Sequence, residues 1–105
     1  MPWTRHPGAE VINAQTPPSM PADMPVFIAQ GTADTVVLAW PNAVLLEKWC
    51  AAGSDVSMLW MGEISHPAAA ITAGPQAVSW IADRFAGLDV PRTCDSPIPV
   101  AIPAP

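Results

Sequence analysis

The sequence predicts an α/β fold in which elements follow one another as strand, helix, strand and helix. Two short apolar runs, 25–30 and 56–61, are expected to be strands covered on both faces, as in a parallel sheet. Two segments with apolar residues at helical spacing, 41–52 and 75–86, are expected to be the helices. Parallel strands joined by a helix form a βαβ unit, which the second helix then follows.

Length and composition indicate a single acidic domain. The chain has 105 residues, 50% of them hydrophobic and 12% charged, and a net charge of -5. We expect neither a nucleic-acid partner nor an anionic membrane surface, because both require a basic face. No apolar run approaches the ~20 residues of a membrane span. The first residues also lack the apolar stretch of a signal peptide.

Prolines gather at the two ends of the chain and divide it into three parts. Residues 1–24 are expected to be an irregular, proline-rich lead-in with room for one short helix at 9–14. Residues 25–94 are expected to be the ordered part, and residues 95–105 an extended proline-rich tail. The tail is compatible with a polyproline ligand and with a disordered end, of which the disordered end is the simpler interpretation.

The second helix has clear end signals. Gly74-Pro75 is expected to open it and Gly87 to stop it. Between them, Val78, Ile81 and Phe85 form one apolar stripe.

Two polar residues follow the strands where chemistry is expected. Asp34 comes just after the first strand, and His66 comes just after the second. In open parallel sheets, ligands bind beyond the carboxyl ends of the strands, so these loops can bring a carboxylate to an imidazole. The carboxylate would fix the ring tautomer and leave the other nitrogen as a general base. Alternatively, Asp34 is a turn residue and His66 a surface residue.

The segment Met24 to Val37, with Ala-Gln-Gly-Thr-Ala-Asp inside it, resembles the acid-bearing segment of α/β-hydrolases. The resemblance is to actinobacterial hydrolases related to secretory lipases, and it covers residues 22–94. Gly62-x-x-x-His66 before a last helix matches the family's order and spacing. The resemblance implies that the chain is the C-terminal βαβα part of an α/β-hydrolase fold with an incomplete sheet. It implies a secreted or cell-envelope location, with Asp34 and His66 as the acid and base of a catalytic triad.

The family's serine nucleophile lies in Gly-x-Ser-x-Gly, and no serine in this chain has glycines two positions away on both sides. The oxyanion-hole segment is absent too, and Pro67 is expected to hold His66 in extended backbone angles. Whether the chain is an enzyme therefore stays open. The resemblance implies a fragment of a lipase- or esterase-type carboxylic ester hydrolase, which would act on an ester or lipid once completed by its N-terminal half. Alternatively, it is a non-catalytic remnant or complementing half that binds a partner chain.

Two cysteines, Cys50 and Cys94, are expected to form a disulfide, since the resembling hydrolases are exported. The alternative is two unrelated thiols. We expect no cofactor and no metal, because a dense His/Cys cluster is missing. Glu63, three residues before His66, is then a solvated loop carboxylate.

Tryptophans complete the set of candidate residues. Those expected in the core are Trp49, Trp60 and Trp80. Trp3 and Trp40 are expected in loops. Trp40 follows Asp34 closely and is a candidate wall of a substrate pocket, with core or interdomain packing as the simpler interpretation. An incomplete sheet also exposes a strand edge, so self-association through that edge is expected.

Overall fold

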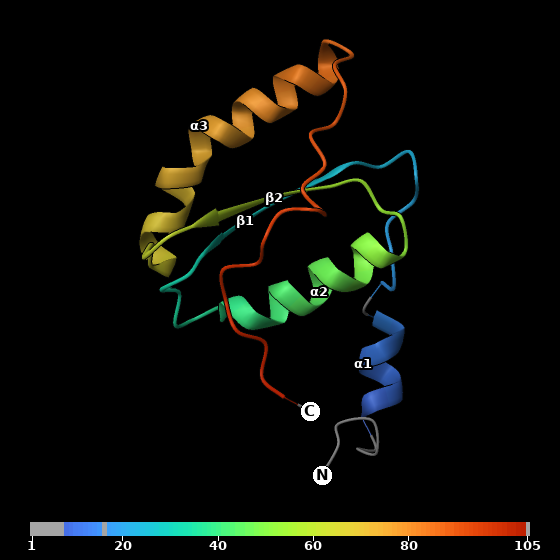
Figure 1. Ribbon diagram of the computed structural model, residues 1–105, viewed down its shortest axis with the longest axis vertical. Helices are drawn as coiled ribbons and strands as arrows, with labels where there is room; N and C mark the ends of the chain where they lie inside the picture. Colours follow the sequence, from blue (N-terminus) through green and yellow to red (C-terminus); the bar gives the residue numbers. More distant parts are fainter. Residues whose placement is uncertain (1–7, 16, 105) are drawn as a thin grey trace.

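The structure is a computed structural model that describes residues 8–15 and 17–104. In this part of the chain, three helices and two strands follow one another. They are α1 Ala9–Gln15, β1 Val26–Gly31, α2 Ala39–Ala51, β2 Val56–Met61 and α3 His66–Phe85 (Figure 1). Helix α1 lies where the sequence predicts a short helix in the lead-in.

The two strands are parallel, as the sequence predicts. Their ladder runs from Val26 opposite Val56 to Gly31 opposite Met61. Helix α2 packs on one face of this sheet and α3 on the other (Figure 1). The chain therefore has an α/β fold, and the unbroken apolar runs of the strands reflect cover on both faces.

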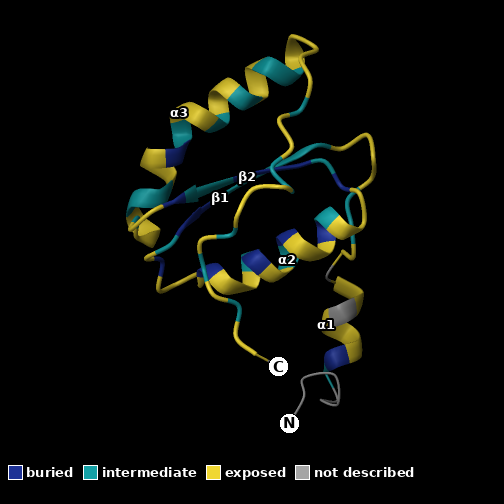
Figure 2. Ribbon diagram, in the orientation of Figure 1, coloured by how far each residue is buried: buried dark blue, intermediate teal, exposed yellow. Residues whose placement is uncertain are grey.

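The main core lies between the sheet and α2. Leu46 and Trp49 of α2 form a buried cluster with Val56 and Met58 of β2 (Figure 2). Half-buried residues packed around this cluster are Met20, Val26, Ile28, Leu45, Cys50, Trp60 and Ile98. The prediction of a core position is thus confirmed for Trp49, and Trp60 lies at the edge of the same core.

The second face of the sheet is covered by α3. Phe27 points to this face, and its ring centroid lies 5.8 Å from that of Trp80. The indole Nε1–H of Trp80 donates to Ser57 Oγ at 3.0 Å, so a buried polar group of β2 is satisfied from α3. Trp3 lies outside the described residues.

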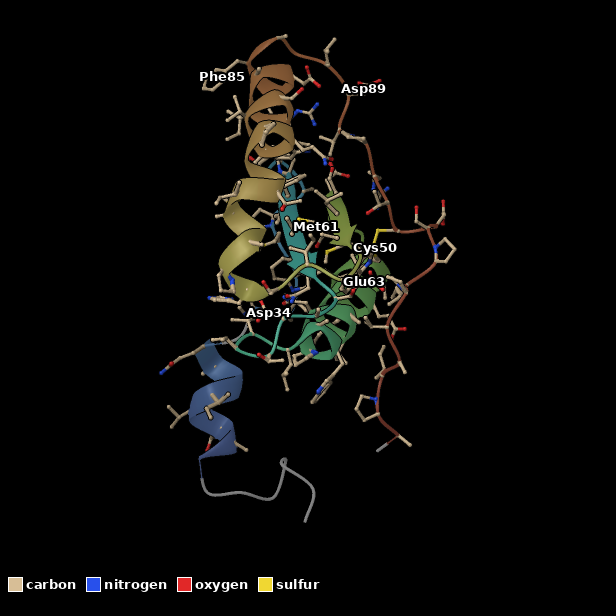
Figure 3. All side chains as sticks on the ribbon, turned by 90° about the vertical axis from the view of Figure 1, so that its left-hand side faces the viewer. Asp34, Cys50, Met61, Glu63, Phe85 and Asp89 are labelled. Carbon is tan, nitrogen blue, oxygen red and sulfur yellow. A yellow bond between two sulfur atoms is a disulfide. The ribbon has the colours of Figure 1, made fainter. Side chains whose placement is uncertain are left out.

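The segment after α3 covers the outer edge of β2. Thr93 donates its N–H to Val56 O at 3.0 Å, and its hydroxyl oxygen accepts the N–H of Met58 at 2.8 Å. One residue later, the predicted disulfide between Cys50 and Cys94 is confirmed, with the Cα atoms 5.6 Å apart. Figure 3 shows this bond joining α2 to the C-terminal segment. The segment is thus held by hydrogen bonds, a covalent bond and packing at Ile98.

Helix α3 begins at His66, eight residues before the predicted start at Gly74. Pro67 lies in its first turn, where a helix needs no N–H donor. The expectation that Pro67 keeps His66 extended is wrong, because Ser65 takes the extended conformation as the N-cap residue. Pro75 lies inside the helix, which changes direction partway along in Figure 1.

The apolar stripe predicted on this helix faces solvent rather than the core. Val78, Ile81 and Phe85 are all exposed, and so is Ile71 on an earlier turn. Phe85 is 90% exposed and points away from the ribbon in Figure 3. Helix α3 therefore packs on the sheet through the Trp80 face and leaves this stripe uncovered within the described residues.

Candidate active site

Asp34 and His66 lie side by side at the carboxyl ends of the two strands. His66 Nδ1 is 2.9 Å from Asp34 Oδ2. An ionised carboxylate can only accept a hydrogen bond, so the proton sits on Nδ1. The predicted approach of the two side chains to hydrogen-bond distance is thus confirmed. The Asp34 side chain is 5% exposed and that of His66 47%, which leaves the far side of the ring open.

The Asp34 carboxylate is fixed on both oxygens. Oδ1 accepts the backbone N–H of Val36 at 2.9 Å and that of Val37 at 2.8 Å, while Oδ2 faces His66. Burial raises the pKa of Asp34, but the hydrogen bonds from His66 and from the two backbone N–H groups outweigh it. The pKa of Asp34 is therefore below its ordinary value, and the group is charged at neutral pH.

A buried glutamine in β1 anchors the acid loop, which is the segment 32–38 between β1 and α2 that carries Asp34. Gln30 donates through Nε2 to Gly31 O at 3.0 Å and to Val37 O at 2.9 Å. Its Oε1 accepts Nδ2–H of Asn42, from α2. Gln30 is not among the site residues predicted from the sequence. The signal for it was a polar side chain within an otherwise apolar strand, since buried amides need partners on both ends.

The serines nearest in sequence to this pair have other roles. Ser54 Oγ accepts the N–H of Met20 at 3.0 Å, and Ser57 Oγ donates to Pro91 O at 2.7 Å. Ser65 is the covalent neighbour of His66, so its hydroxyl is badly placed to give a proton to that ring. The hydroxyls of Ser54 and Ser57 thus support the fold, and none of the three serines has the setting of a nucleophile.

Trp40 and Glu63 lie near the pair in sequence, but neither side chain is part of the Asp34–His66 hydrogen bond. Trp40 is in the first turn of α2, not in a loop, because the helix starts at Ala39. Its side chain is 42% exposed, so it is not part of the core. Glu63 is an exposed loop residue, and no group of three or more possible metal ligands occurs among residues 8–15 and 17–104.

A cavity of about 300 Å³ lies elsewhere, between α3 and β2, and neither Trp40 nor the Asp34–His66 pair lines it. Its lining residues are Phe27, Ser57, Met58, Leu59, Gln76, Ser79, Trp80, Asp83, Pro91 and Thr93.

No helix in the described part of the chain is long and apolar enough to cross a membrane.

Comparison with known proteins shows relatives among lipases and esterases. The chain is 35% identical to Lipase 5 of Candida albicans over 72 residues, which are 68% of this chain and 16% of the relative. It is 28% identical to Lipase A of Arthroderma benhamiae, over 69% of this chain and 15% of the relative. A probable trichothecene esterase of Stachybotrys chartarum is 33% identical over 59% of this chain and 13% of the relative.

The chain thus spans about a sixth of the length of the curated relatives that it matches. No solved structure matches it, and these relatives do not bear on an actinobacterial origin. The model of the secretory lipase family matches residues 9–91, which include both strands and both members of the Asp34–His66 pair. The chain belongs to the secretory lipase family.

Proposed function

We propose that this chain is the acid–base portion of a carboxylic ester hydrolase of the lipase or esterase type, built on an α/β-hydrolase fold. The observation that carries the proposal is the Asp34–His66 hydrogen bond, with Nδ1 turned to a charged carboxylate and the rest of the ring half-exposed. Membership of a family described as secretory lipases and the names of the relatives support the same reaction class and a secreted location.

The chemistry follows from the state of the His66 ring. Its Nε2 would take the proton of a serine hydroxyl as the serine oxygen attacks the ester carbonyl. It would then give that proton to the leaving alcohol, which produces an acyl-enzyme. In the second half, Nε2 takes a proton from water as the water oxygen attacks the acyl carbonyl. It then gives that proton to the serine oxygen, whose bond to the acyl carbon breaks as the acid product leaves. Asp34 stays ionised throughout and stabilises the imidazolium, a task that fits its lowered pKa.

No serine here lies in Gly-x-Ser-x-Gly, and we propose that the nucleophile comes from outside these 105 residues. We therefore propose that an ester or lipid substrate is turned over only when a serine-bearing segment joins the pair. A preformed Asp34–His66 pair on a small sheet is suited to that role.

A second candidate role is that of a complementing half that binds a partner chain without catalysis of its own. The outer edge of β1 favours it. Val26 N–H donates to Asp55 O, and Thr32 N–H donates to Met61 O. The backbone N–H and C=O groups of alternate residues between them therefore point toward β2. Phe27 and Ala29 then direct their backbone groups to the other side, where no strand pairs with β1 within the described chain. Such an edge pairs with another strand, including one from a second copy.

One experiment separates the two roles. The chain is assayed on a short-chain nitrophenyl ester, alone and mixed with a polypeptide that supplies the Gly-x-Ser-x-Gly part of a family member. We expect turnover only in the mixture, and we expect His66→Ala and Asp34→Asn to remove it. Asp89→Asn, which changes an exposed carboxyl group beyond α3, is the matched control and should keep full activity. If the mixture with His66→Ala is as active as the parent, His66 is no catalytic base. If the two polypeptides co-elute without turnover, the complementing role stands alone.

A further inference from the structure

The Asp34–His66 pair is built from two loops that are far apart in sequence. The ladder of the sheet ends at Gly31 and Met61, and both residues of the pair lie beyond it, 32 positions apart. A 2.9 Å contact between side chains on separate loops requires that the loops themselves be fixed to each other. The sheet alone cannot do this, since its hydrogen bonds stop before either residue.

Three hydrogen bonds continue from the sheet into the loops. Thr32 N–H donates to Met61 O at 3.0 Å, and Ala33 N–H donates to Ile64 O at 3.2 Å. The third is made by a side chain: Thr32 Oγ1 accepts the N–H of Glu63 at 2.8 Å. The acid loop is thus joined by three hydrogen bonds to the end of β2 and to the base loop, which is the segment 62–65 between β2 and α3. Of these, only the bond to the Thr32 hydroxyl is made by a side chain and can be removed by a substitution.

The bond from Glu63 has a specific task. Glu63 has a φ of 60°, a left-handed conformation that residues with a Cβ rarely adopt. Such a conformation persists where surrounding contacts hold it. The hydrogen bond to Thr32 Oγ1 is the contact made by the Glu63 N–H. Without it, the turn would relax and reorient the chain that leads to His66, three residues on.

Close packing of the two loops limits how they can move. A Cβ added to Gly31 would lie 2.1 Å from Ile64 O, so the Ile64 carbonyl already rests against the backbone of the acid loop. The loops therefore cannot come closer together, but they can separate. The Thr32 hydroxyl opposes that separation on the side where His66 leaves the turn.

We infer that Thr32 is a positioning residue for the Asp34–His66 pair. Its hydroxyl holds the Glu63 turn against the acid loop and so keeps Nδ1 of His66 on the Asp34 carboxylate. The consequence for catalysis rests on the function proposed above, whereas the consequence for the geometry of the pair does not.

The test replaces Thr32 by valine, which has the same shape and lacks the hydroxyl. The readout is the tautomer of the His66 ring in the 105-residue chain, taken from the nitrogen-15 shifts of the imidazole, with His6→Gln present to leave one histidine signal. We expect Nδ1–H in the parent and a shift toward the Nε2–H tautomer in Thr32→Val. Thr32→Ser should restore the parent state. Thr35→Val, the same change at an exposed site in the same loop, should leave it unaltered.

Activity gives the second readout. In the complemented assay described above, Thr32→Val should lower kcat by about 10- to 100-fold with little change in KM, as expected when a catalytic pair is displaced but the substrate site is intact. A parent-like tautomer in Thr32→Val would overturn the inference. So would a general loss of cooperative melting in that variant but not in Thr32→Ser, because the hydroxyl would then support the fold rather than the pair. A mixture that never shows turnover would refute the proposed function, and the tautomer would still decide the role of Thr32.

Discussion

Breaking the Cys50–Cys94 disulfide should lower the free energy of unfolding by about 4 kcal/mol. The two residues are 44 positions apart, so the bond closes a long loop that contains β2 and α3. In the chain-entropy treatment, a closed loop of this length reduces the entropy of the unfolded chain by about 13 cal/mol/K, which is about 4 kcal/mol at 25 °C. Whole domains are stable by only about 5–15 kcal/mol, so this single bond carries a large part of the total.

The assay is urea unfolding followed by tryptophan fluorescence, with and without a reductant, since Trp49 is buried in the core. The matched control is the double variant Cys50→Ser/Cys94→Ser, whose midpoint should equal that of the reduced parent and should not respond to reductant. Hydrogen exchange at the Met58 amide gives a local check, because its acceptor on Thr93 lies next to the disulfide. Equal midpoints for the oxidised and reduced parent would refute the reasoning.

Three further predictions concern the carboxyl group of Asp34, the contact between Gly31 and Ile64 O, and the free edge of β1. The folded pKa of Asp34 is below its ordinary value of about 3.9, so its charged form stabilises the fold above that pH, and this contribution is lost as the pH falls through the lower, folded pKa. Asp34→Asn should therefore be less stable than the parent at pH 7 and should flatten the fall in melting temperature below about pH 4, which Asp89→Asn should leave steep. Gly31→Ala should cost about 1–3 kcal/mol in urea unfolding, because its Cβ would meet Ile64 O, whereas Gly62→Ala meets no atom within 4 Å and should be nearly neutral. Size-exclusion chromatography should show self-association or a marginally stable chain. A monodisperse monomer that melts cooperatively above ~60 °C would contradict the importance of the free edge.

The strands and their direction could be predicted because their signals are local. An unbroken apolar run such as 26–29 suits a strand with helices on both faces, whatever the rest of the chain does. The start of α3 could not be read in the same way. Gly74-Pro75 has the appearance of a helix start, but residues 68–73 are mostly alanine and continue the helix across it. The N–H that Pro75 lacks would have bonded to the carbonyl of Ile71, and both residues are exposed, so water can take its place.

The Asp34–His66 approach was predictable because parallel strands end at the same edge of a sheet. The contacts that fix it were not. Gln30 and Thr32 act through partners 7 to 31 residues away, and their roles depend on how the loops align in space. The close contact of Gly31 with Ile64 O appears only when the second loop is placed against the first.

The free edge of β1 and the exposed side of the His66 ring, which carries Nε2, lead to the same conclusion about how a complete active site would form. The acid is already charged, held by two backbone N–H groups and hydrogen-bonded to the ring. A serine-bearing partner that docks at the β1 edge would therefore meet a base whose tautomer is already set. That partner would have to supply the oxyanion hole and a serine whose Oγ lies at hydrogen-bond distance from Nε2. Because ordering of the pair is complete before association, the partner's binding free energy need not be used to assemble it, and the pair should be detectable in the chain alone.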